Sequence, residues 1–108
     1  MAEQDPSSDQ LKKQTKLSAA VLMVKELFQE RFEHILERRL GRPVSYSITF
    51  TGKQEHGRLI MEIYIEGIHA RLVSLTLYRI LKAMMFNGIR RTREGKHYKV
   101  SAAIPSWF

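Results

Sequence analysis

The sequence predicts one small α+β domain in which an antiparallel sheet packs against two helices in the order α-β-β-α-β-β. Three observations lead to this class. One long segment has apolar residues at helical spacing, several segments alternate as strands do, and a second apolar helical segment lies between them. The length of 108 residues suits one core. We expect a flexible leader over residues 1–14 and a single domain over residues 15–108.

The first helix is expected from Leu17 to Leu40. Its apolar residues recur at spacings of three and four and form one stripe, while most charged residues fall on the other side. Gly41 and Pro43 end it, because glycine accepts a left-handed cap and proline cannot continue a helix. Its start is less sharply defined, since Asp9 or Ser18 would serve as the N-cap.

Two strands follow, over Val44–Thr51 and Arg58–Glu66, because apolar and polar residues alternate in both segments. The polar segment Gly52–Gly57 between them is expected to be a hairpin loop, which makes the strands antiparallel neighbours. One face of the second strand would meet solvent or a partner, and it carries Ile60, Glu62, Tyr64 and Glu66.

The second helix is expected over Ile68–Phe86 and ends before Asn87-Gly88. It is apolar on most sides, so one of them would serve as a subunit interface. A second hairpin then joins a short strand at Ile89–Thr92 to a longer one at Lys96–Ile104. The terminal Trp107 and Phe108 are expected to fold back onto the body, because an exposed aromatic pair would be adhesive.

Charge is distributed unevenly. The net charge is +7, yet residues 1–40 carry seven basic and seven acidic residues, so the whole excess lies in residues 41–108. Such an asymmetry favours a polyanionic partner over simple solubility. The chain has no cysteine, no apolar run long enough to cross a membrane, and a polar N-terminus. We therefore expect a protein of the cytoplasm or nucleus with no membrane partner.

No motif indicates catalysis. The four histidines lie in different elements without metal-ligand spacing, and no phosphate loop, nucleophile elbow or dinucleotide fingerprint occurs. Glu62 and Glu66 share a strand face, but a solvated outer face explains them better than acid–base chemistry. We expect no enzymatic activity, no cofactor and no metal.

Basic residues form the strongest constellation. Five of them crowd the second hairpin, and a stripe on the second helix extends the charge; the candidate nucleic-acid-binding residues are Arg71, Tyr78, Arg79, Lys82, Arg90, Arg91, Arg93, Lys96 and Lys99. Arginine and lysine contact phosphates, and each neutralised phosphate releases counterions. The sequence therefore predicts a dimeric nucleic-acid-binding protein, a regulator or accessory factor, with DNA favoured over RNA.

Residues 74–100 support DNA through a resemblance. The segments Ser74–Leu81, Asn87–Arg91 and Gly95–Val100 resemble the recognition helix and wing of winged-helix DNA-binding regulators, in particular the ferric-uptake-regulator type. The resemblance implies that Thr76, Tyr78 and Arg79 face DNA and that residues 90–99 form the wing. The element order is also similar to that of RNA-binding folds, although their Gly-x-x-Gly loop does not occur here.

The alternative is a protein-interaction module, such as an adaptor, inhibitor or assembly subunit. The apolar second helix, the strand face with Ile60 and Tyr64, and the aromatic C-terminus would supply its contacts. It predicts a stable homodimer or a complex with another protein.

Overall fold

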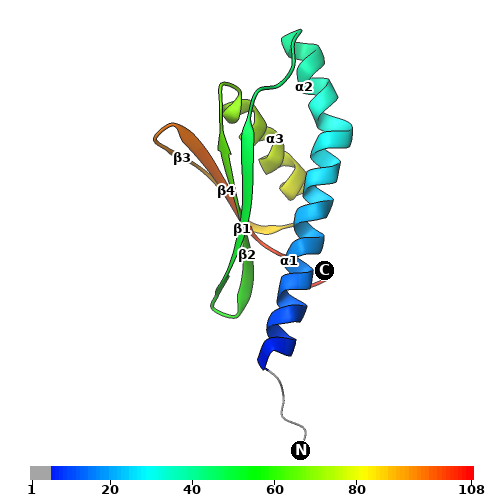
Figure 1. Cartoon of the computed structure of the whole chain (residues 1–108), viewed down its shortest axis with the longest axis vertical. Coiled ribbons are helices and arrows are strands. Elements are labelled where there is room, and N and C mark those ends of the chain that lie inside the picture. Colours follow the sequence, from blue (N-terminus) through cyan, green and yellow to red (C-terminus); the bar gives the residue numbers. More distant parts are fainter. Residues whose placement is uncertain (1–5) are drawn as a thin grey trace, which may run out of the picture.

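The computed structural model describes residues 6–108, with the backbone alone for residues 6–10 (Figure 1). One long helical rod comprises α1 (Pro6–Leu27), a π-helical turn η1 (Phe28–Phe32) and α2 (Glu33–Leu40). Residues 6–14 are therefore helical where a flexible leader was predicted, and residues 1–5 lie outside the described residues. Proline suits the first helical turn, where its missing N–H would have no helical partner. The suggested caps Asp9 and Ser18 lie inside α1.

The π-helical turn adjusts the apolar stripe of the rod. Ala20, Val24, Phe28 and Leu36 are buried, and Phe32 between the last two is half-buried, so the inward residues recur every four positions. In an α-helix each step of four residues rotates the stripe by about 40°. The wider turn, in which the Glu33 N–H donates to the Phe28 carbonyl, absorbs part of that rotation. The rod thus keeps its apolar side on the sheet.

The four-stranded sheet confirms the predicted α+β class and element order. Its strands are β1 (Ser47–Glu55), β2 (Arg58–Glu66), β3 (Asn87–Glu94) and β4 (His97–Ala103), arranged β1-β2-β4-β3 with every neighbouring pair antiparallel. Helix α3 (Ala70–Ala83) connects β2 to β3 and is shorter than predicted. Asn87 and Gly88, expected to end that helix, begin β3 instead.

The first hairpin has a tighter turn than the predicted loop Gly52–Gly57. Residues 52–55 continue β1, and only His56 and Gly57 form the turn, both with positive φ. This is the geometry of a two-residue type I′ connection, whose twist matches that of the flanking strands. Gly52 instead allows close packing, because a Cβ there would collide with a methyl group of Leu17 on α1.

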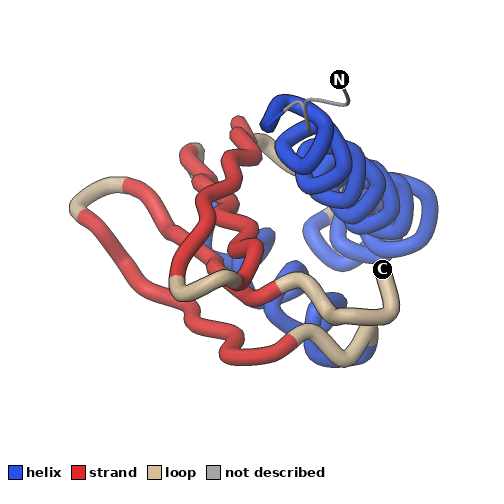
Figure 2. The backbone as a smooth tube through the Cα atoms, turned by 90° about the horizontal axis from the view of Figure 1, so that it is seen from below, coloured by secondary structure: helices blue, strands red, loops and turns tan. Residues whose placement is uncertain are grey.

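Both helical layers cover the same face of the sheet, and the other face carries no helix from residues 6–108 (Figures 1 and 2). The rod packs on the β1–β2 half, while α3 packs on β3 and β4. The core between the layers includes Val24, Phe28, Met61, Ile63, Ile65, Val73, Leu77, Ile80, Leu81 and Val100. In that same span, no helix has the length and apolar character needed to cross a bilayer.

The connection into α3 is tied to the segment before β1. The Ser45 N–H donates to Nδ1 of His69 at 2.8 Å, and the Ser45 carbonyl accepts from the His69 N–H at 3.1 Å. Gly67 adopts a φ of 121°, and a Cβ there would lie 2.9 Å from both the Ser45 carbonyl oxygen and the Tyr46 Cα. Only glycine fits this backbone conformation and this approach.

The C-terminal segment folds back in part, as predicted. Phe108 is half-buried and meets Phe86 edge-on at 6.0 Å between ring centroids. Trp107 stacks on Phe108 at 4.7 Å, yet 58% of it remains exposed.

Candidate nucleic-acid interface

Strand alternation divides the basic residues of the second hairpin between the two faces of the sheet. Arg91 pairs with Val100, whose side chain is in the core, so Arg91 and Arg93 project toward the helical side. Arg90 and Lys99 project toward the open face. The basic residues that crowd this hairpin therefore do not share one surface, because neighbouring residues in a strand point in opposite directions.

On the helical side, Arg91 is held in place by α3 and β4. Its Nε donates to the Ser74 hydroxyl oxygen at 2.8 Å, and its guanidinium lies over the Tyr98 ring at 5.0 Å from the centroid. The Ser74 hydroxyl itself donates to the Arg71 carbonyl at 2.7 Å. Ser74 is fully buried, so this hydrogen bond holds the Nε of Arg91 in a fixed position. A guanidinium has five N–H donors, and this bond uses only one of them.

The outer side of α3 continues this charge. Arg71, Arg79 and Lys82 are exposed and Tyr78 is half-buried, whereas the helix contains no acidic residue. At about 100° per residue, Arg71, Tyr78 and Lys82 lie within about 80° of Ser74, beside β3, and Arg79 lies further round. We call this group the helix-side basic surface; it comprises Arg71, Tyr78, Arg79, Lys82, Arg91 and Arg93.

Two further residues lie outside this surface. Lys96 is exposed in the turn between β3 and β4, at the tip of the hairpin. Thr76, which the family resemblance placed toward DNA, is instead 9% exposed, and its hydroxyl donates to the Leu72 carbonyl at 3.0 Å. The side of α3 that carries Thr76 is packed in the domain, so this hydroxyl is not presented to a ligand.

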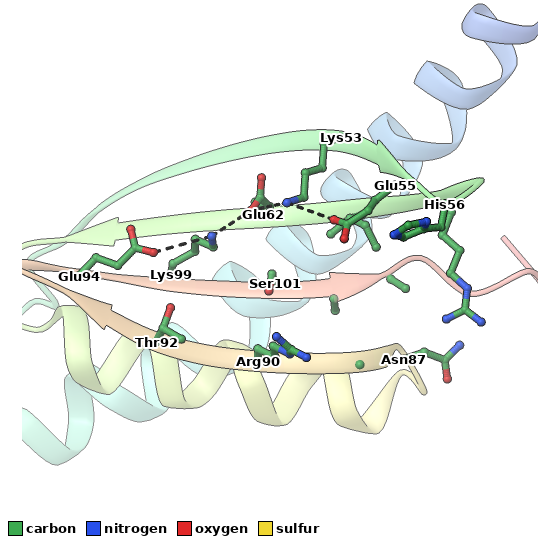
Figure 3. Close-up of a pocket in the computed structure, with 15 residues that line it drawn as sticks. Lys53, Glu55, His56, Glu62, Asn87, Arg90, Thr92, Glu94, Lys99 and Ser101 are labelled. Carbon is green, nitrogen blue, oxygen red and sulfur yellow. Dashed lines mark ion pairs between the residues drawn. The ribbon is translucent and has the colours of Figure 1, made fainter.

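The open face holds Lys99 in a network of ion pairs (Figure 3). Its Nζ lies 3.1 Å from a Glu62 carboxylate oxygen and 3.7 Å from one of Glu94, and Lys53 lies 3.7 Å from the same Glu62 oxygen. The two lysines cover Glu62, which is 9% exposed although the sequence placed it on a solvated face. The hydrogen bond to Glu62 raises the pKa of Lys99. The charge of Lys99 is thus largely compensated within the protein.

A groove of about 780 Å³ runs over the open face. Its charged lining is mixed, with the cations Lys53, Arg58, Arg90 and Lys99 and the carboxylates Glu55, Glu62 and Glu94. The helix-side basic surface has five cations and no carboxylate among its residues. Within residues 11–108, none of these five cations takes part in an ion pair, whereas Lys53 and Lys99 of the open face do. The positive charge of the helix-side basic surface is therefore less compensated by carboxylates.

Sequence reasoning missed Ser74 as the partner of Arg91 and Glu62 as the partner of Lys99. A signal existed for Ser74, since it is a small polar residue among the apolar positions of α3. For Glu62 there was none, because its contact with Lys99 depends on the β2–β4 register, in which Glu62 pairs with Ser101 and Tyr64 with Lys99.

No protein-family model, no curated protein and no solved structure matches this chain.

Proposed function

We propose that this protein binds nucleic acid, with DNA as the preferred partner, through the helix-side basic surface. The observation that carries the proposal is the anchored Arg91 beside the acid-free outer side of α3. Phosphates of a nucleic-acid backbone are the polyanion that such a surface suits, because each contact neutralises a charge and releases counterions. An arginine already held in position loses less conformational entropy when it binds.

The dimensions of α3 agree with a backbone contact. Its 14 residues span about 21 Å, which corresponds to about six base pairs at 3.4 Å each. Arg71 and Lys82 lie near opposite ends of the helix, so they reach phosphates several nucleotides apart. Tyr78 lies between them and offers an aromatic edge to a sugar or base.

Fluorescence polarisation with labelled single- and double-stranded DNA and RNA tests the proposal. The variant Arg71→Ala/Arg79→Ala removes two charges from the surface, and Arg31→Ala/Arg38→Ala removes two exposed charges from the helical rod. Both variants have the same net charge, so their comparison isolates position. We expect at least tenfold weaker binding for the first and less than twofold change for the second. Equal losses, or no binding by the wild type, would contradict the proposal.

A protein-binding role is the second candidate, because large apolar residues are exposed around α3. Ile68 just before the helix is 84% exposed, and Met85 just after it is 75% exposed. Met85 also has a positive φ of 64°, which is unusual for a residue with a side chain. This candidate predicts a homodimer in light scattering at micromolar concentration, which Met85→Lys would dissociate. A monomer would exclude self-association.

A further inference from the structure

The inward stripe of α1 changes from apolar to basic toward its N-terminus. Ala20 and Val24 are buried against the sheet, and Leu17 packs on Gly52. Residues four positions apart lie on the same side of a helix, so Lys13 precedes Leu17, and Lys16 precedes Ala20, on the sheet-facing side. Lys13 and Lys16 thus lie at positions that continue the apolar stripe of α1.

A second pocket, of about 420 Å³, lies where these lysines meet the sheet. It is bounded by α1, by the β1–β2 hairpin and by the segment that follows β4. Three cations line it, Lys13, Lys16 and Arg58, together with the apolar Leu59, Ile104 and Pro105; of these, Arg58 also borders the groove of the open face. The other lining residues are uncharged, so the pocket has no carboxylate among the described residues.

Among residues 11–108, the cations of this pocket have no carboxylate partner. Within residues 11–108, no ion pair involves Lys13, Lys16 or Arg58. Three cations around one cavity repel each other, and an anion bound between them would relieve this repulsion. The apolar residues beside them favour a ligand with an organic part as well as a charge.

We propose that this pocket binds a small organic phosphate monoester. Lys13, Lys16 and Arg58 contact the phosphate, while Leu59, Ile104 and Pro105 contact the organic part. A phosphate monoester carries a charge of about −1.5 to −2 at neutral pH and has three acceptor oxygens, which suits three cations better than a single carboxylate does. The volume falls in the usual range of small-molecule sites, roughly 300–1,000 Å³.

This proposal is independent of nucleic-acid binding, because none of the residues of the helix-side basic surface lines the pocket. The two sites can therefore be tested separately. Loss of one binding activity while the other is retained would identify which proposal fails.

NMR titration of the ¹⁵N-labelled full-length protein tests the ligand class, with phenyl phosphate, inorganic phosphate, benzoate and phenol as probes. We expect phenyl phosphate to shift the amide signals of Gly57, Ile104 and Ser106 with saturation, inorganic phosphate to shift them more weakly, and phenol to leave them unchanged. No shift with phenyl phosphate, or shifts confined to α3 and β3, would overturn the proposal. Equal affinity for benzoate would overturn the assignment to phosphate.

Matched variants test the residues. Lys13→Ala/Lys16→Ala removes two cations of the pocket, whereas Lys12→Ala/Lys25→Ala removes two exposed cations of the same helix that do not line it. Phenyl phosphate should bind the first variant at least tenfold more weakly and the second within twofold of wild type. Equally weakened binding by both variants would show that the ligand is attracted by net charge alone. Unchanged binding by the first variant would show that the lysines only cover apolar surface. Either result would refute the site. The dispersion of the NMR spectrum reports the fold of each variant.

Discussion

Arg91 on β3 and Ser74 on α3 are joined by a 2.8 Å hydrogen bond that crosses from the sheet to the helix beneath it. The serine is fully buried, and its own hydroxyl donates a hydrogen bond to the Arg71 carbonyl. Ser74 therefore orients an arginine of β3 and also contacts the backbone of α3, the helix that carries Arg71, Arg79 and Lys82. Arg91 is thus held in a defined position beside the cations of α3.

Replacing Ser74 with alanine should weaken nucleic-acid binding with little effect on the fold. Immobilising a long side chain costs about 0.5–1.5 kcal/mol of conformational entropy. Without the Ser74 hydroxyl, Arg91 would be immobilised only when the ligand binds, so this cost would be subtracted from the binding free energy. We expect roughly two- to tenfold weaker binding in polarisation measurements. The control Ser101→Ala removes a half-buried hydroxyl from the open face, and its affinity should match that of the wild type. An affinity of Ser74→Ala equal to wild type would show that the anchor is unimportant.

Lys99 should matter for stability more than for binding. Without Lys99, Glu62 retains only the longer contact with Lys53, at 3.7 Å, in a site where it is 9% exposed. Leaving such a group poorly paired costs about 1–3 kcal/mol. Urea denaturation of Lys99→Ala should therefore show a lower free energy of unfolding, while its affinity for DNA changes less than twofold. A large loss of affinity in a folded variant would place the ligand on the open face instead.

Stability should fall in alkaline solution. The Glu62 carboxylate raises the pKa of Lys99 above 10.5, and burial raises the pKa of Tyr46 above 10.0. Both groups hold their protons more tightly when folded, so their contributions are complete below these values and are lost as the pH rises through the folded pKa values. Urea midpoints measured from pH 8 to pH 11.5 should decline above pH 10. Glu62→Gln and Tyr46→Phe should each make the decline shallower, and unchanged slopes would count against these causes.

Gly67 should be far less replaceable than Gly57. A Cβ on Gly67 would meet backbone atoms of Ser45 and Tyr46 at 2.9 Å, whereas one on Gly57 would meet nothing within 4 Å. Both residues have positive φ, so alanine at either position costs about 1 kcal/mol or more in strain. Gly67→Ala adds a clash with backbone that cannot rotate away. Thermal unfolding should show a clearly lower Tm for Gly67→Ala than for Gly57→Ala, and equal values would contradict the close approach.

The fold was predictable from the sequence where periodicity is strong. The limits of β2 and the inward set Met61, Ile63 and Ile65 follow from strict alternation, and Gly41 ends the rod as expected. The helical start at Pro6 was not predictable in this way, because residues 6–14 contain a single large apolar residue, Leu11, and no stripe. The extension of β1 through polar residues to Glu55 depends on its pairing with β2.

The sequence allowed the candidate residues to be named, but not the faces of the domain on which they lie. All nine candidate residues are present in the described structure, yet they lie on two faces and a hairpin tip. The strand predicted at Ile89–Thr92 already implies that Arg90 and Arg91 point to opposite faces, and the extension of β3 to Glu94 places Arg93 on the side of Arg91. The pairing of Lys99 with Glu62 arises from residues 37 positions apart, which local patterns do not report.

The salt dependence of DNA binding tests the central proposal most directly. Polarisation titrations from 50 to 200 mM NaCl should give a linear fall of log affinity with log salt for the wild type. Arg71→Ala/Arg79→Ala should reduce the slope by about 1.8, at about 0.9 per lost phosphate contact. Lys53→Ala/Arg90→Ala, which removes two cations that line the groove of the open face and not the second pocket, should leave the slope unchanged. A wild-type slope near zero, or an equal reduction in both variants, would contradict binding through the helix-side basic surface.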